Sequence, residues 1–212
     1  MTPEEIVEIS RILEGVQDPV VVNLGAYQGE DHPIFAGVAG DPARLTHIMV
    51  EPDPGNCAVI RRNVPLSEKV VLVQGAIYSE PGHRQFWRSL IPTNGQTASG
   101  SILKPTGVLV THPQITWPQI IEVDCFTLDE LYEKQRLDKV DLLWVDIQGA
   151  EVAMIRGGQK ALAKTRFCIM EADEDEIYEG QLLRKDLIAL MDGWIFVRDL
   201  GYDIMMQNTR YL

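Results

Sequence analysis

The chain contains few cysteines, and their number and placement argue against both a disulfide-stabilised protein and a zinc-binding protein. Its 212 residues include only Cys57, Cys125 and Cys168, and each lies in an apolar or helical stretch. An odd number of scattered cysteines predicts neither a disulfide framework nor a zinc site. We therefore expect three reduced, buried thiols without a chemical role.

Basic residues are also scarce. Lysine and arginine number 19 against 31 acidic residues, which gives a formal net charge of -12. Such a charge repels phosphate backbones and acidic lipid headgroups. We therefore expect neither nucleic acid nor a membrane surface among the partners of this protein.

Long hydrophobic runs are absent as well. The chain opens on the acidic letters MTPEE with no apolar stretch behind them, so we expect no secretory signal, no membrane span and a cytoplasmic location. Hydrophobic residues still make up 45% of the sequence, without repeats or low-complexity segments. This length and composition predict a single domain over residues 1–212, with an N-terminal helix within 1–16.

The most informative segment is an apolar run followed by a glycine turn. The letters VVVNLGAYQGE begin at Val20, and IMVEP begins at Ile48. A β-branched run suits a strand covered on both faces, and Gly25 and Gly29 let the backbone bend sharply near a ligand. Glu51 follows Gly29 by about 20 residues, the spacing at which doubly wound folds place the carboxylate that accepts ribose hydroxyls. The segment therefore predicts an adenosine site.

The glycine spacing distinguishes between adenosine cofactors. The turn reads G-x-x-x-G, whereas dinucleotide-binding turns read G-x-G-x-x-G and seat a pyrophosphate on the helix that follows. This favours S-adenosylmethionine over NAD. A purely structural turn is the competing interpretation, and Gly25, Gly29 and Glu51 together weigh against it.

Helical and strand patterns alternate along the rest of the chain. Helices are expected over residues 3–15, 33–39, 54–63, from 127 onward, 151–162 and 181–191. Strands are expected from residue 20 to the glycine turn and over residues 47–51, 69–77, 120–126, 140–146, 166–171, 194–198 and 202–206. Residues 81–119 read as an irregular insertion beside the acceptor. The pattern predicts an α/β fold with a doubly wound, Rossmann-like, mainly parallel sheet and a C-terminal antiparallel strand pair.

Three acids are expected at the carboxyl ends of central strands, and the fold would bring them to one rim: Glu51, Asp146 and Glu171. Such a cluster calls for a cation, which the sulfonium and ammonium groups of S-adenosylmethionine supply. A divalent metal such as Mg²⁺ could supply more, with Asp146 and Glu171 as its candidate ligands. The competing interpretations are a helix cap for Asp146 and a solvated strand end for Glu171.

Two residues are candidates for the catalytic base. Methyl transfer to a hydroxyl requires removal of its proton, and Asp146 could accept it directly, through water, or assist indirectly by holding a metal that lowers the pKa of the hydroxyl. His112 is the alternative, because its ordinary pKa suits proton removal near neutrality and it lies in the irregular insertion.

Four motifs carry a resemblance to a known family. The letters NLGAYQG from Asn23, EPDP from Glu51, TLDEL from Thr127 and VDLLWVDIQGAE from Val140 occur in the order seen in FkbM-family methyltransferases. The resemblance runs from about residue 20 to 206 and implies a class I, S-adenosylmethionine-dependent O-methyltransferase. The cofactor-binding residues expected from the motifs and the strand ends are Asn23, Gly25, Ala26, Gly29, Glu51, Pro52, Gly75, Ala76 and Asp146.

This sequence departs from the family pattern at two positions. Gln148 replaces the first glutamate of D-x-E-G-x-E, and Asn23 stands where the family usually has aspartate. The resemblance favours an enzyme acting on a hydroxyl of a sugar, glycan or natural-product small molecule, with a second subunit as one way to complete an open acceptor site. The two departures motivate an alternative, an S-adenosylmethionine-binding protein with weak or lost turnover. An NAD-dependent oxidoreductase is the remaining alternative, disfavoured by the missing third glycine.

Overall fold

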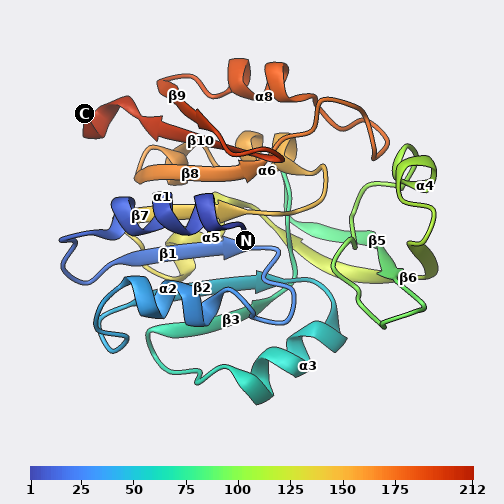
Figure 1. Cartoon of the computed structure of the whole chain (residues 1–212), viewed down its shortest axis with the longest axis horizontal. Coiled ribbons are helices and arrows are strands. Elements are labelled where there is room, and N and C mark those ends of the chain that lie inside the picture. Colours follow the sequence, from blue (N-terminus) through green and yellow to red (C-terminus); the bar gives the residue numbers. More distant parts are fainter.

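The structure is a computed structural model that describes residues 1–212, and its centre is a seven-stranded sheet (Figure 1). In spatial order the strands are β3 (Val70–Gln74), β2 (Thr46–Glu51), β1 (Val20–Leu24), β7 (Val140–Val145), β8 (Thr165–Glu171), β10 (Asp203–Asn208) and β9 (Trp194–Asp199). The strands from β3 to β8 run parallel, and β10 is antiparallel to both β8 and β9. The predicted α/β fold, mainly parallel with a C-terminal antiparallel pair, is confirmed.

Helices cover both faces of this sheet. One face carries α1 (Pro3–Leu13), α2 (His32–Val38) and α3 (Pro54–Asn63), and the other carries α5 (Leu128–Lys134), α6 (Glu151–Gly157), α7 (Gln159–Leu162) and α8 (Arg184–Leu190). Val21 packs with Ile9 on the first face, whereas Val22 packs with Met154 on the second. Consecutive strand residues point to opposite faces, so the whole apolar run of β1 is buried.

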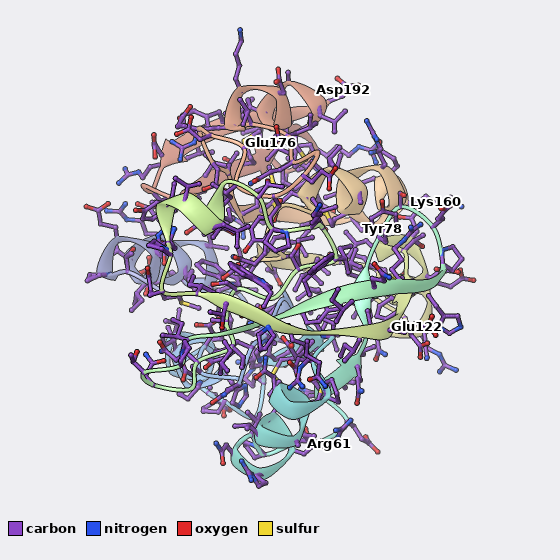
Figure 2. All side chains as sticks on the ribbon, turned by 90° about the vertical axis from the view of Figure 1, so that its right-hand side faces the viewer. Arg61, Tyr78, Glu122, Lys160, Glu176 and Asp192 are labelled. Carbon is purple, nitrogen blue, oxygen red and sulfur yellow. The ribbon has the colours of Figure 1, made fainter.

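A second, three-stranded sheet lies beyond the carboxyl ends of the central strands (Figures 1 and 2). Its strands, in order, are β4 (Ala76–Ile77), β6 (Thr116–Phe126) and β5 (Gly82–Leu90), with β5 antiparallel to β6. Figure 2 shows β5 and β6 crossing the front of the molecule, with α3 below them. This sheet covers the edge at which a doubly wound fold places its ligand.

The prediction of an irregular stretch over 81–119 is wrong in its first and last parts. That stretch contains all of β5, the short helix α4 (Val108–Thr111) and the start of β6. The residues of β5 read GHRQFWRSL, and among its large apolar side chains only Phe86 is buried. The strand forms because it pairs with β6, about 35 positions away, and such long-range pairing leaves no local hydrophobic alternation to read.

Other boundaries differ by a few residues. The expected strand 69–77 breaks at Gly75, whose φ of 144° turns the chain out of β3 into β4 of the second sheet. The last helix begins at Arg184, later than the predicted residue 181. All three cysteines are free and buried, as expected. None of the helices combines the length and apolarity needed to span a membrane. The single-domain assignment of residues 1–212 stays a prediction.

Candidate functional site

A cleft lies between the carboxyl ends of the central strands and the second sheet. Most of the expected cofactor-binding residues line it: Gly25, Glu51, Pro52, Gly75, Ala76 and Asp146. They come from the turns after β1, β2, β3 and β7, from the last residue of β2 and from the first residue of β4. The strand order therefore brings together residues that are up to 121 positions apart in the sequence, at the crevice typical of this class of sheet.

The glycine turn after β1 forms one wall of the cleft. Gly25 has φ +80°, and a β-carbon there would overlap the carbonyl oxygen of Asp146. The amides of Gly25 and Ala26 both donate to the carbonyl oxygen of Val50, each at 3.0 Å. The turn is therefore fixed between β2 and β7, and only glycine fits its first position.

Three expected cofactor residues lie outside the cleft lining. Ala26 is buried with Met49 and Ile60, and a β-carbon on Gly29 would lie 2.7 Å from a methyl carbon of Val64. These two residues thus let the turn pack against α3. The third, Asn23, is fully buried in β1, where its Nδ2 donates to Oδ2 of Asp31 at 3.4 Å.

Glu51 is held in one orientation by three donors. Its Oε2 accepts from the Tyr27 amide at 2.9 Å, and its Oε1 accepts from the Asp53 amide at 2.9 Å and from Asn56 Nδ2 at 3.2 Å. Burial raises the pKa of Glu51 to about 8, although these hydrogen bonds favour the ionised form. A ligand hydroxyl that donates to this carboxylate would favour ionisation further.

An ion pair that the sequence did not reveal fixes the second sheet over this side of the cleft. Arg88 of β5 contacts Asp53 through two bonds, Nε to Oδ2 at 2.6 Å and Nη2 to Oδ1 at 3.0 Å. Thr97, in the loop after β5, donates to Oδ1 of Asn56 at 2.9 Å. Bidentate arginine–carboxylate contacts constrain geometry strongly. β5 and the loop after it therefore form a fixed cover over the cleft, called its roof below.

Several lining residues are not among the individual residues expected from the sequence. Phe86, Thr97, Ala98, Gly100 and Ile102 all belong to the stretch that was expected to be irregular and to lie beside the acceptor, whereas Tyr27 lies within NLGAYQG and Asn56 lies two positions after EPDP. The two motifs indicate Tyr27 and Asn56, whereas for the other five residues the sequence indicated only the segment as a whole.

Asp146 lines the other end of the cleft, and Gln148 bridges its carboxylate to that of Glu171, which is not among the lining residues. Asp146 lies directly after β7, is accessible from the cleft and donates its backbone amide to Leu24 O at 2.9 Å. The Nε2 group of Gln148 donates to Asp146 Oδ1 at 2.6 Å and to Glu171 Oε2 at 2.7 Å. Removal from bulk water raises the pKa of both carboxyls, and their mutual repulsion raises that of Glu171 further.

The structure does not support the Mg²⁺ site suggested for these acids. No group of three or more histidine, cysteine, aspartate or glutamate side chains is arranged to hold a metal ion. The amide hydrogens of Gln148 also point at the facing oxygens of Asp146 and Glu171, where a shared cation would have to sit. The donor set therefore does not fit a metal.

His112 does not line the cleft. It is exposed at the end of α4, and its Nδ1 lies 3.0 Å from the hydroxyl of Thr111. Asp146 is the only one of the two candidate bases among the lining residues.

Comparison with known proteins identifies the family. The model of the methyltransferase FkbM domain matches residues 23–204. The 2-O-methyltransferase NoeI of Sinorhizobium fredii (strain NBRC 101917 / NGR234) is 32% identical over 203 residues, which cover 91% of this chain and 81% of that protein.

Two solved structures share the fold. The FkbM methyltransferase of Methylobacillus flagellatus KT superposes with a TM-score of 0.56 at 14% identity, over 97% of this chain and 50% of that chain. Cofactor-bound Rv0187 from MTB superposes with a TM-score of 0.53 at 13% identity, over 99% of this chain and 81% of that chain. The fold is that of class I methyltransferases, and the protein belongs to the FkbM family of S-adenosylmethionine-dependent methyltransferases.

Proposed function

We propose that this protein transfers a methyl group from S-adenosylmethionine to a hydroxyl oxygen of a sugar, glycan or natural-product small molecule. The observation that carries the proposal is the cleft itself, which has the oriented carboxylate of Glu51 on one wall and the accessible carboxylate of Asp146 on another. The name of the relative NoeI, a 2-O-methyltransferase, supports oxygen as the atom that is methylated.

The lining residues fit the parts of the cofactor. Glu51 faces the cleft as an acceptor suited to ribose hydroxyls, and the nearby wall of Ala76, Ile77 and Phe86 is apolar, as an adenine ring requires. Gly25 and Asp146 then border the methionine end. In this arrangement the methyl group would face Asp146.

The chain's own groups supply orientation and proton removal. When bound, S-adenosylmethionine supplies a methyl carbon already activated by its sulfonium leaving group. Asp146 would accept the proton of the acceptor hydroxyl as its oxygen is methylated. The raised pKa of Asp146 makes its carboxylate a stronger base than an ordinary aspartate. The rigid turn after β1 contributes by holding the reactants in line.

The proposal is tested with methyl-labelled S-adenosylmethionine and a panel of acceptors. We expect label on the hydroxyl oxygens of neutral sugars, oligosaccharides or polyketide alcohols, and none on RNA or DNA, because the net charge is -12. Mass spectrometry of the product would locate the methyl ether. Label on nitrogen or carbon would contradict the proposal. Cofactor binding without transfer to any acceptor would support the alternative of a binding protein that lacks turnover.

A further inference from the structure

Gln148 occupies a backbone conformation that side chains seldom adopt. It has φ +53° and is followed by Gly149 at φ +94°, in the tight turn between β7 and α6. This turn directs the side chain of Gln148 back to the carboxylate of Asp146, directly after β7, and to that of Glu171, the last residue of β8. Unusual backbone conformations of this kind occur where the surrounding contacts over-determine them.

Contacts on both ends fix the orientation of the Gln148 amide. Tyr178 donates its hydroxyl to Gln148 Oε1 at 2.8 Å, while Nε2 donates to Asp146 and Glu171. A flipped amide would place its oxygen against two carboxylates. Because NH₂ has two hydrogens and both carboxylates are acceptors, the arrangement satisfies every polar atom of the side chain.

The same residue is tied to the segment that covers the cleft. Ser101 donates its hydroxyl to the Gln148 carbonyl oxygen at 2.7 Å, and Gly100 and Ile102 on either side of it line the cleft. The hydroxyl oxygen of Tyr178 also lies 3.2 Å from the carbonyl oxygen of Ser99. Gln148 therefore joins the roof of the cleft to the carboxylates of Asp146 and Glu171.

We propose that Gln148 is a positioning residue, which aims the Asp146 carboxylate at the acceptor hydroxyl by holding it and Glu171 on one side-chain amide. This inference rests on the proposed function. Two neighbouring carboxylates repel each other when both are ionised, and a shared hydrogen-bond donor offsets this repulsion. Glutamate at this position, as in the family pattern, offers at most one hydrogen and cannot hold both.

The kinetic test compares Gln148→Met and Gln148→Glu with the wild type. A displacement of about 1 Å at a reacting group can cost about 100-fold in rate. We expect kcat to fall by at least about 10-fold in both variants, while KM for S-adenosylmethionine stays within about 3-fold. Gln159→Met is the matched control, because it removes a glutamine side-chain amide of α7 that donates to the Ile155 carbonyl of α6, and it should leave kcat unchanged. A kcat within about 2-fold of wild type in Gln148→Met would overturn the proposal.

An NMR measurement tests the contact without turnover. The side-chain amide proton signals that disappear in Gln148→Met are those of Gln148, and two charge-assisted hydrogen bonds should shift both downfield. We expect these signals to move in Asp146→Asn and again in Glu171→Gln. Signals that move in neither variant would overturn the proposal even if the enzyme is active. If the wild type methylates no acceptor, the proposed function fails, and the amide signals still decide whether Gln148 holds both acids.

Discussion

Replacing Asp146 by asparagine is expected to lower kcat by about 100-fold or more. Asparagine keeps an oxygen for the Gln148 amide and nearly the same volume at the end of the cleft, but it cannot take a proton from the acceptor hydroxyl. We therefore expect the Kd for S-adenosylhomocysteine to change by less than about 5-fold, a small effect beside the loss of general-base catalysis. Steady-state kinetics with an identified acceptor, combined with calorimetric titration, measures both quantities.

The matched control for this variant is Asp138→Asn. Asp138 is a fully exposed aspartate whose only close partner is Lys164, at 3.4 Å, and such surface pairs contribute little. It should leave both kcat and Kd unchanged. Undiminished turnover in Asp146→Asn would show that another group removes the proton, or that the acceptor arrives already ionised.

Gly25→Ala is expected to lower the free energy of unfolding by about 3 kcal/mol or more and to abolish measurable cofactor binding. Alanine at φ +80° is strained, and its methyl group would overlap the Asp146 carbonyl oxygen. The turn after β1 would have to separate from the end of β7, which opens the wall of the cleft. Urea denaturation followed by calorimetric titration measures the two effects.

Gly40→Ala is the control that separates the two effects of Gly25→Ala, backbone strain and the overlap with the Asp146 carbonyl oxygen. Gly40 has φ +76°, close to that of Gly25, and a β-carbon there would meet no atom within 4 Å. We expect this control to cost only about 1 kcal/mol and to leave cofactor binding unchanged. Equal losses in the two variants would mean that close approach at Gly25 has no special importance.

The central sheet could be predicted because its strands are marked by patterns between neighbouring residues in the sequence. The apolar run of β1 and the fully buried run of β7 are continuous in sequence, as strands covered on both faces must be. The helix starts at Thr2 and Thr127 were also predictable, because each capping box needs only residues three positions apart. Because these strands run parallel, the carboxylates at their carboxyl ends lie at the same edge of the sheet.

The roof of the cleft could not be predicted, since it depends on pairing between distant segments. β5 is polar and gains its structure from β6, and the Arg88–Asp53 pair joins positions 35 residues apart. The departure of Gln148 from the family pattern is visible in the sequence, but its contacts are not. Those contacts depend on how close the ends of β7 and β8 lie and on the position of Tyr178.

The ionisation of Glu51 links cofactor affinity to pH. In the free protein its pKa is raised to about 8 by burial, so much of the population is protonated at pH 7. Ribose hydroxyls that donate to Glu51 would bind the ionised form, and binding below pH 8 must then release a proton. Affinity should therefore increase as the pH rises from 7 through 8 and level off above it.

Calorimetric titration with S-adenosylhomocysteine and with NAD, at pH 7 and pH 9, tests most directly whether the cleft is a methyl-donor site. Glu51→Gln serves as the matched variant, because the titration of the ligand itself is common to both proteins. We predict binding of S-adenosylhomocysteine, no binding of NAD, and a gain in affinity from pH 7 to pH 9 that is larger in the wild type than in Glu51→Gln. Binding of NAD, or no binding of S-adenosylhomocysteine at either pH, would contradict the account of the cleft.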